Sequence, residues 1–303
     1  MNNSSHIAIS TAWNTARHTS GSQVIGELCN LGFESFELAA GTDKSMLPSI
    51  VPMVESGEIE VVSLHNPCPA AREQTPLSAP DKYRREAAVM QAAETIKWAE
   101  RFGARLVVLH AGLVEINFEQ KTAGRLIGAG FRAEGEAIVK EDMARRNRVR
   151  EPFLKSTIES LGELIPIASA AGVRLGLETR YYYTEIPSLE EFQIIFDELD
   201  SPVLGYWHDT GHEHVQETLG LAEKGEYLRR YSGRMAGIHV HDAVNSSDHR
   251  AVGRGEIEFD RIMQSVPKEA RIVLEVHAPA SGADLVKSRE RIEAALKNRP
   301  PDA

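Results

Sequence analysis

Residues 237–259, GIHVHDAVNSSDHRAVGRGEIEF, join a short apolar strand pattern to a dense group of polar side chains. The strand pattern runs into three histidines and two aspartates, and a glycine-containing turn then leads into a helical pattern. Imidazoles and carboxylates gathered just beyond a strand end are typical of a metal site and not of a hydrophobic core. Other apolar segments of the chain also end in His, Asp or Glu, and this repetition supports a functional interpretation.

Short apolar segments alternate with amphipathic helical patterns along the whole chain. Strands are predicted at about residues 7–10, 35–39, 59–64, 105–109, 173–177, 203–207, 235–240 and 272–276. Eight strands, each followed by a helix, predict an α/β fold of the (β/α)8 TIM-barrel type, with residues 1–303 forming one domain. A doubly wound open sheet is the competing fold. It more often has a glycine-rich phosphate turn after its first strand, and residues 11–21, TAWNTARHTSG, are not such a turn.

Residues 113–150 interrupt this alternation after the fourth strand. They are charged and contain several glycines, so we predict an insertion or lid that packs outside the barrel. Within them the run MARRNRVR, residues 143–150, is locally basic. We interpret it as a solvated helix face, and contact with phosphate or DNA is the alternative.

The charge balance argues against several classes of function. With 34 Lys and Arg against 44 Asp and Glu, the formal net charge of −10 disfavours broad electrostatic binding to nucleic acid. No apolar run is long enough for a membrane span, and the N-terminal residues lack a signal-peptide pattern. We therefore expect a cytoplasmic protein without a nucleotide cofactor, and leave homo-oligomer formation open. Cys29 and Cys68 are expected to be reduced thiols.

The carboxyl ends of barrel strands meet on one face, where active sites of this fold lie. This geometry gathers polar residues from seven different segments: Glu37, His65, His110, Glu178, Asp209, His212, His239, His249 and Glu275. Such a set suits zinc, manganese, cobalt or iron, and the absence of thiolates disfavours a closed structural zinc site.

Each of these residues also has a structural interpretation. Glu178 and Glu275 end apolar strands, where an unpaired carboxylate would have a large desolvation cost, and Arg180 is the buried partner that could offset it for Glu178. Asp209 could cap the following helix. His241 is expected to face away from His239, and Asp242 to be structural.

Seven motifs occur in order along the chain: LHNP, VVLHAG, LGLET, HDTGH, IHVHD, DHRAVGRGEIEF and LEVH. Together they resemble the xylose isomerase-like TIM-barrel superfamily, which holds sugar and sugar-phosphate isomerases and epimerases and also type IV apurinic endonucleases. The resemblance covers nearly the whole barrel, with residues 113–150 as an apparent insertion.

The isomerase and epimerase branch implies one divalent metal (Mn, Zn, Co or Mg) held by residues that match Glu178, Asp209, His239 and Glu275. Glu178 and Glu275 would also remove and return a proton beside a carbonyl. His212 and Arg250 match substrate-contacting positions, and His65 and Trp13 are further candidates for substrate contact. We expect an enzyme of carbohydrate metabolism acting on a small sugar or sugar phosphate.

The endonuclease branch implies additional zinc ions. His65 and His110 match a second site, and His212 and His249 are further candidates. That branch has an Asp and a His separated by one residue, whereas Asp248 and His249 are adjacent in this chain. Metal-dependent cleavage of damaged DNA or another phosphodiester is therefore the first alternative function, and a lyase acting on an oxidised sugar is the second.

Overall fold

A computed structural model describes residues 7–71, 73 and 75–299 of the chain. Within them, eight parallel strands form a closed barrel in the order β1-β12-β9-β8-β6-β4-β3-β2. The prediction of a (β/α)8 barrel is thereby confirmed, and each predicted strand segment overlaps an observed one. The barrel strands are β1 Ile7–Ser10, β2 Ser35–Leu38, β3 Glu60–His65, β4 Leu106–Leu109, β6 Arg174–Glu178, β8 Leu204–Asp209, β9 Met235–Val240 and β12 Arg271–Leu274.

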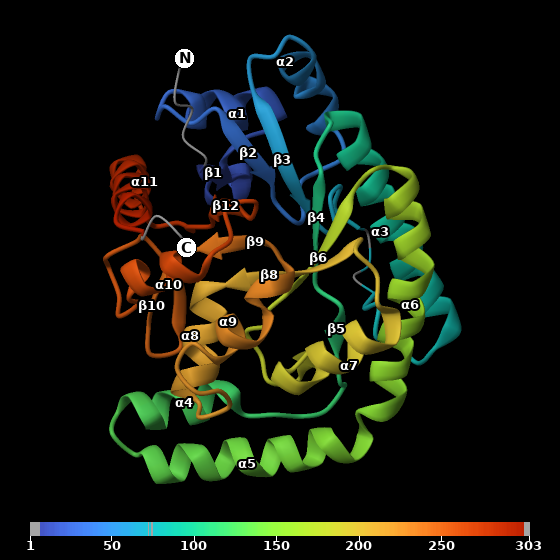
Figure 1. Ribbon diagram of the computed structural model, residues 1–303, viewed down its shortest axis with the longest axis vertical. Coiled ribbons are helices and arrows are strands. Elements are labelled where there is room, and N and C mark those ends of the chain that lie inside the picture. Colours follow the sequence, from blue (N-terminus) through green and yellow to red (C-terminus); the bar gives the residue numbers. More distant parts are fainter. Residues whose placement is uncertain (1–6, 72, 74, 300–303) are drawn as a thin grey trace.

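Helices surround the barrel (Figure 1). Their ends follow local sequence signals: Asp81 caps α3 through its side chain, Gly103 ends that helix with a left-handed φ of 69°, and Ser188 with Glu191 forms the predicted capping box of α7. The outer α-helices are α1 Gly21–Cys29, α2 Val51–Glu55, α3 Lys82–Phe102, α6 Glu151–Ala170, α7 Leu189–Leu199, α8 Thr210–Thr218, α9 Glu226–Tyr231, α10 Phe259–Ser265 and α11 Gly282–Lys297. Short 3-10 turns are η1 Thr11–Trp13, η2 Thr15–Arg17, η3 Leu47–Ser49 and η4 Ser232–Arg234.

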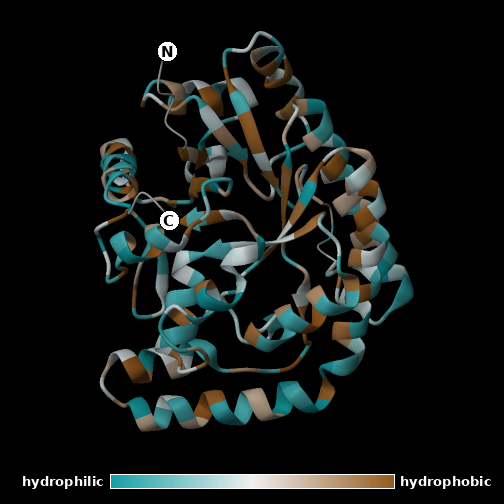
Figure 2. Ribbon diagram, viewed as in Figure 1, coloured by the Kyte–Doolittle hydropathy of each residue, from teal (hydrophilic) through white to brown (hydrophobic). Residues whose placement is uncertain are grey.

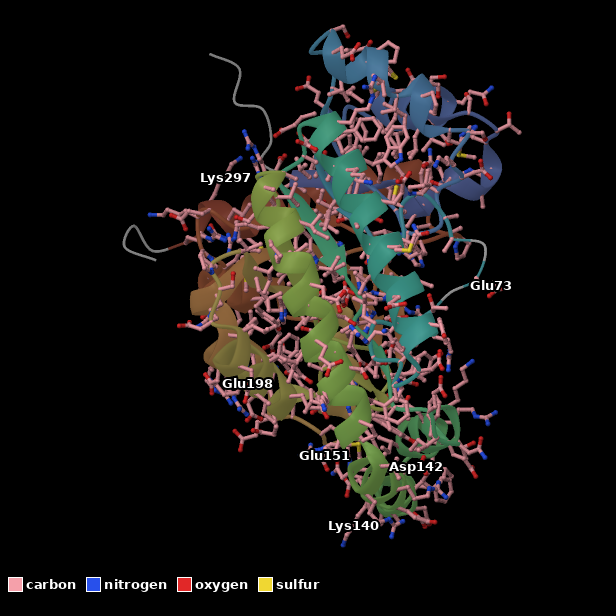
Figure 3. All side chains as sticks on the ribbon, turned by 90° about the vertical axis from the view of Figure 1, so that its right-hand side faces the viewer. Glu73, Lys140, Asp142, Glu151, Glu198 and Lys297 are labelled. Atoms are coloured by element: carbon pink, nitrogen blue, oxygen red, sulfur yellow. The ribbon has the colours of Figure 1, made fainter. Side chains whose placement is uncertain are left out.

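The segment between β4 and α6 forms two helices outside the barrel, α4 Gln120–Gly128 and α5 Arg132–Val149. Figure 3 shows α5 continuing into α6, with Glu151 at their junction. A two-stranded ribbon, β5 Gly112–Leu113 with β7 Glu185–Ile186, ties the start of this insertion to the loop after β6. On its other side, α4 packs against the turn of a second ribbon, β10 Asp242–Val244 with β11 Ser247–Arg250, which follows β9.

The basic run at the end of α5 is not a solvated helix face throughout, so this prediction is wrong for Arg146. The Arg146 side chain is fully buried and forms two hydrogen bonds of 2.7 Å to the carboxylate of Glu191 on α7. Arg145 pairs with Asp142 on its own helix, and Arg148 is exposed. The run therefore anchors the insertion to the outer layer of the barrel.

Hydrophobic residues follow the barrel strands, whereas α5 and α11 have many hydrophilic residues (Figure 2). Trp207 fills the centre of the barrel and is fully buried. Gly176 and Gly237 make room for its ring, because a Cβ at these positions would come within 2.8 and 2.3 Å of indole carbon atoms. Both cysteines are free, as predicted. Across the described residues, every helix is too short or too polar to cross a bilayer.

Candidate metal centre

The barrel brings the predicted strand-end residues into one buried cluster. Four of them offer ligand atoms that all lie within 4.8 Å of one another: Glu178 of β6, Asp209 of β8, His239 of β9 and Glu275 just after β12. The Nδ1 atom of His239 lies 2.6 Å from Glu178 Oε1, 3.1 Å from Glu275 Oε2 and 3.8 Å from Asp209 Oδ2. One imidazole nitrogen thus faces three carboxylates.

The opposite nitrogen of His239 is also held by a carboxylate. Its Nε2 lies 2.9 Å from Glu37 Oε1 on β2, and the Ser63 hydroxyl donates a 2.8 Å hydrogen bond to Glu37. The indole of Trp207 packs edge-on against the imidazole of His239, with the two ring centroids 5.0 Å apart. These contacts orient Nδ1 toward the three carboxylates, as a partner on the second nitrogen does for histidine ligands of metals.

The cluster has an excess of negative charge in a region that is almost entirely buried. Burial by itself lowers the pKa of His239, but the carboxylates of Glu275, Glu37 and Glu178 outweigh burial and raise that pKa well above its usual value. Burial raises the pKa of Glu275, and His239 and His249 outweigh burial and hold it well below its usual value. Buried carboxylates need compensating cations. A divalent metal, which binds the same donor types, fits the charge and the ligand set of this site.

Glu178 also has the buried partner that the structural interpretation requires. Arg180 donates a 2.8 Å hydrogen bond to Glu178 Oε2 and a 2.6 Å hydrogen bond to Glu185 Oε1. His110 Nε2 contacts the same Oε2, and His65 Nε2 lies 3.7 Å from it. Both interpretations therefore apply to Glu178, because its Oε1 faces the metal centre while its Oε2 is paired.

Asp209 likewise has a structural role and a place in the cluster. Its Oδ1 accepts a 2.7 Å hydrogen bond from the backbone N–H of His212 and so caps α8. The Nδ1 atom of His212 lies 2.9 Å from the carbonyl oxygen of Thr179, to which it can donate. In that neutral form the Nε2 of His212 is an acceptor, and it lies 3.6 Å from Asp248.

His241 is at the metal centre, so the expectation that it faces away is wrong. Its Nε2 lies 3.0 Å from the Asp209 carboxylate, and its ring stacks on His249 with centroids 4.2 Å apart. Residues two positions apart along a strand share a face, and this alternation predicts that His241 lies on the side of His239. His277 stacks on His249 as well and was not predicted, although it follows Glu275 by the same two-residue spacing. Asp242 is structural as predicted, since it accepts backbone hydrogen bonds from the turn after β11.

A cavity of about 520 Å³ contains the exposed edge of this cluster. Its lining consists of small residues and polar residues: Ala12, Ala16, Ala39, Ala40 and Gly41, and Thr15, His65, His110, Glu178, Arg180, His212, His249, Glu275 and His277. The structure does not bring Trp13 or Arg250 to this cavity. The Trp13 indole is buried and donates to the carbonyl of Ala280, and Arg250 is exposed on β11 with a 3.4 Å contact to Ser247.

Other groups of potential metal ligands at the barrel mouth overlap the four-residue cluster or lie next to it. Besides that cluster, geometry suited to a metal occurs in three triplets: His65, Glu178 and His239; His212, His241 and His249; His249, Glu275 and His277. The four-residue group offers one more ligand than any triplet, three of its members are carboxylates, and all four are buried, as are the members of the triplet of His65, Glu178 and His239. It is therefore the strongest candidate for a single divalent metal.

Solved structures of similar fold include a D-tagatose 3-epimerase-like protein, with 18% sequence identity and a TM-score of 0.70 over 96% of this chain and 97% of that one. D-Psicose 3-epimerase from Clostridium cellulolyticum H10 is 14% identical, with a TM-score of 0.69 over 96% and 99% of the two chains. An IOLI protein with a zinc atom is 15% identical, with a TM-score of 0.66 over 97% and 99%. Identities this low establish a shared fold and not a shared substrate.

A comparison with curated protein sequences gave no significant match. A family model for the xylose isomerase-like TIM barrel matches residues 26–297. This range includes seven of the eight barrel strands and all four residues of the candidate metal centre. The chain therefore belongs to the xylose isomerase-like TIM-barrel family.

Proposed function

We propose that this protein is a divalent-metal-dependent isomerase or epimerase acting on a small sugar or sugar derivative. The observation that supports it best is the buried group of Glu178, Asp209, His239 and Glu275, in which two glutamates flank one imidazole nitrogen. Proteins of similar fold are named D-tagatose 3-epimerase-like protein, L-ribulose 3-epimerase and IOLI protein with zinc. A Lewis acid next to two carboxylates suits removal of a proton from the carbon beside a carbonyl.

The four residues would hold the metal through one imidazole nitrogen and three carboxylates, a donor set suited to Mn, Zn, Co or Mg. When bound, the metal supplies Lewis-acid polarisation of the substrate carbonyl and stabilises negative charge that develops on its oxygen. Proton transfer and substrate binding are carried out by side chains of the protein.

Glu275 is the better of the two glutamates for accepting the substrate proton. Both glutamates line the cavity, and the carboxylate of Glu275 faces the imidazoles of His239 and His249, which carry no permanent charge. Glu178, in contrast, is paired with the permanent charge of Arg180, which weakens its attraction for a proton. Glu275 therefore removes the proton. In an epimerisation a proton returns to the opposite face of the same carbon through Glu178, after that carboxylate has taken up a proton from solvent in the cavity. His212 Nε2 lines the same cavity and is placed to accept a hydrogen bond from a sugar hydroxyl.

Metal-dependent phosphodiester cleavage is the second candidate, because the triplet of His65, Glu178 and His239 offers a further ligand group. The cavity is poorly suited to a phosphate backbone. Among its described lining residues Arg180 is the one guanidinium or ammonium group, and two carboxylates already pair with it. A lyase acting on an oxidised sugar begins with the same proton removal and is separated from an isomerase only by its products.

The test is proton exchange in deuterated water. Candidate ketoses and ketose phosphates are incubated with the metal-loaded protein, and NMR follows deuterium incorporation at the carbon beside the carbonyl. We expect label and epimer or isomer from at least one substrate. Glu275→Gln should abolish both, because an amide cannot accept the proton, with a loss of at least about 10²-fold. Label without an isomer, and with loss of water or chain cleavage, would identify a lyase.

Glu217→Gln is the matched control, because Glu217 lies on α8 in a separate cavity outside the barrel. It should exchange protons at the wild-type rate. Absence of label from every ketose together with nicking of abasic-site DNA would replace the isomerase by the phosphodiesterase.

A further inference from the structure

His241 makes two hydrogen bonds to different parts of the barrel mouth. It follows the last residue of β9 and is fully buried. Its Nδ1 lies 2.9 Å from the backbone nitrogen of His249, and its Nε2 lies 3.0 Å from the Asp209 carboxylate. A backbone N–H can only donate, so Nδ1 accepts and the ring proton lies on Nε2, which donates to Asp209. The two neighbours thus select one neutral tautomer.

The first partner, Asp209, is a proposed metal ligand that must keep a fixed orientation. The backbone N–H of His212 holds Oδ1 from the N-terminus of α8, at 2.7 Å. The Nε2 atom of His241 lies 3.0 Å from Oδ2 and from Oδ1. The carboxylate is therefore fixed by a helix end and by an imidazole, and hydrogen bonds of this kind orient metal-binding carboxylates.

The second partner is the β10–β11 ribbon, which reaches the cavity through His249. His249 has a left-handed φ of 54°, which a side chain rarely adopts without support. Its N–H is bound by His241, its ring lies parallel to His241 at 8°, and its Nε2 lies 3.7 Å from Glu275. The ring of His241 thus helps to hold His249 beside Glu275, together with His277, whose N–H donates to the carbonyl of His249 at 3.0 Å.

Gly211, in the DTGH motif, makes room for this ring. A Cβ at Gly211 would lie 2.1 Å from Cε1 and 2.6 Å from Nδ1 of His241. Gly211 does not have a left-handed φ, so its own backbone conformation does not demand glycine. Glycine is therefore required at position 211 to leave space for the ring of His241, and not for the backbone conformation at the start of α8.

We propose that His241 is a positioning residue, a single imidazole that orients Asp209 at the metal centre and anchors His249 of the β10–β11 ribbon beside Glu275. It is not among the residues that line the cavity described above. The inference rests on the proposed function only where it takes Asp209 as a metal ligand, because the hydrogen bonds themselves belong to the protein without metal.

The first experiment measures the tautomer of His241 in the metal-free protein. Nitrogen-15 NMR of the imidazoles, assigned by the signals lost in His241→Gln, should show His241 protonated at Nε2 and unprotonated at Nδ1. Amide hydrogen exchange should also show a protected His249 N–H that becomes unprotected in His241→Phe. A proton on Nδ1 of His241, or an unprotected His249 amide in the wild-type protein, would contradict the proposal.

The second experiment titrates Zn²⁺ into the metal-free protein and its variants. His241→Phe retains an aromatic ring but neither hydrogen bond, and we expect Zn²⁺ affinity to fall by about 10- to 100-fold. His241→Gln can donate to Asp209 and accept from His249, so it should recover at least part of the affinity. A merely space-filling role for His241 would give the opposite order, with Phe better than Gln.

Gly211→Ala should weaken Zn²⁺ binding in the same direction as His241→Phe, because the added methyl group displaces the ring. Gly26→Ala is its matched control, a glycine inside α1 at which a Cβ would meet no other atom within 4 Å. Equal Zn²⁺ affinity in the wild-type protein, Gly211→Ala and His241→Phe would overturn the proposal. A protein that binds no Zn²⁺ at all would refute the metal centre, and the tautomer and amide measurements would then decide the role of His241 alone.

Discussion

Two groups of buried charged residues, one beside the insertion and one at the barrel mouth, balance their charges differently. Beside the insertion, Arg146 meets Glu191 through two hydrogen bonds of 2.7 Å, and a further N–H of its guanidinium donates to the carbonyl of Glu185 at 2.8 Å. Both side chains of this pair are fully buried. The positive charge of the guanidinium balances the negative charge of the carboxylate, so this pair requires no bound ion.

At the barrel mouth the carboxylates outnumber the permanent cations. Four of them converge on the ring of His239, and Arg180 divides its guanidinium between Glu178 and Glu185. Burial of charge is common to both groups and does not by itself mark a functional site. The uncompensated negative charge at the mouth is the feature that favours a metal.

Removal of the metal is expected to cause the largest loss of turnover, because it affects the barrel mouth. It should leave the buried Arg146–Glu191 pair beside the insertion unchanged. A metal in this role contributes several kcal/mol to catalysis, so chelation should reduce turnover on the order of 10³-fold. Adding back Mn²⁺, Zn²⁺, Co²⁺ or Mg²⁺ singly, with turnover and thermal stability followed, should restore activity with at least one ion. Full activity in a protein shown by elemental analysis to be metal-free would remove the distinction between the two groups.

Arg146→Met tests the buried pair beside the insertion, and we expect it to lower stability and not activity. It leaves the buried Glu191 carboxylate without its hydrogen-bonded cation, although Arg150 lies 3.6 Å from Glu191 Oε1. Loss of one partner of a buried pair costs about 3–5 kcal/mol in the free energy of unfolding, and we expect a value near the lower end because Arg150 remains. Adding Glu191→Gln removes the stranded charge while keeping an acceptor for the Ser188 N–H, so the double variant should recover part of the loss. Urea denaturation measures both changes.

The control for Arg146→Met is Arg132→Ala, which breaks an exposed pair with Glu136 on the same helix. Such a pair contributes about 0.3–0.5 kcal/mol. Similar losses of stability for the two arginine variants would show that the buried pair has no special role. Proton exchange by folded Arg146→Met should remain at the wild-type rate, because Arg146 lies outside the cavity.

Glu213 on α8 is buried neither with a paired cation nor at the candidate metal centre, and its charge is instead removed by protonation. Burial, together with the neighbouring Glu217, raises the pKa of Glu213 from 4.5 to about 8, against the backbone N–H groups of Tyr227 and Leu228. Between these pKa values the folded protein binds a proton that the unfolded chain does not. The contribution of this group to stability is therefore present below pH 4.5 and is lost as the pH rises toward 8.

Glu213→Gln should remove this pH dependence. One pKa unit corresponds to about 1.4 kcal/mol, so the free energy of unfolding of the variant should improve relative to wild type on the order of 4 kcal/mol from about pH 5 to about pH 9. Urea denaturation across this range, with Glu217→Gln as a second variant, measures the difference. A constant difference at every pH would mean that Glu213 is charged throughout and has a cationic partner.

The residues that could be predicted are those whose place follows from the strand pattern. Glu178, Asp209, His239 and Glu275 end predicted strands, and a barrel brings such ends together. His241 could also have been predicted, since the two-residue alternation places it beside His239, and the expectation that it faces away departed from that rule. Trp13 was assigned to substrate contact from a position next to the first strand, and its indole instead packs inward, where it donates to Ala280.

Arg146 could not have been placed from its neighbours in the sequence. Its run MARRNRVR has the composition of a solvated helix, and its partner Glu191 lies 45 residues further along the chain. The capping box at Ser188 predicted Glu191 as a helix-start residue but contained no sign that the same carboxylate also receives a guanidinium. Pairing between distant residues leaves no periodic signal.

The sequence by itself determined the barrel, its eight strands and the polar strand ends, because alternation and helical spacing are local patterns that each segment records independently. The tertiary structure alone decided which charges are paired and which are left over. Pairing depends on distances between segments far apart in the chain. Only the closed barrel shows that Arg146 is neutralised by Glu191, that the absence of a side chain at Gly211 makes room for the ring of His241, and that the carboxylates around His239 outnumber the permanent cations beside them.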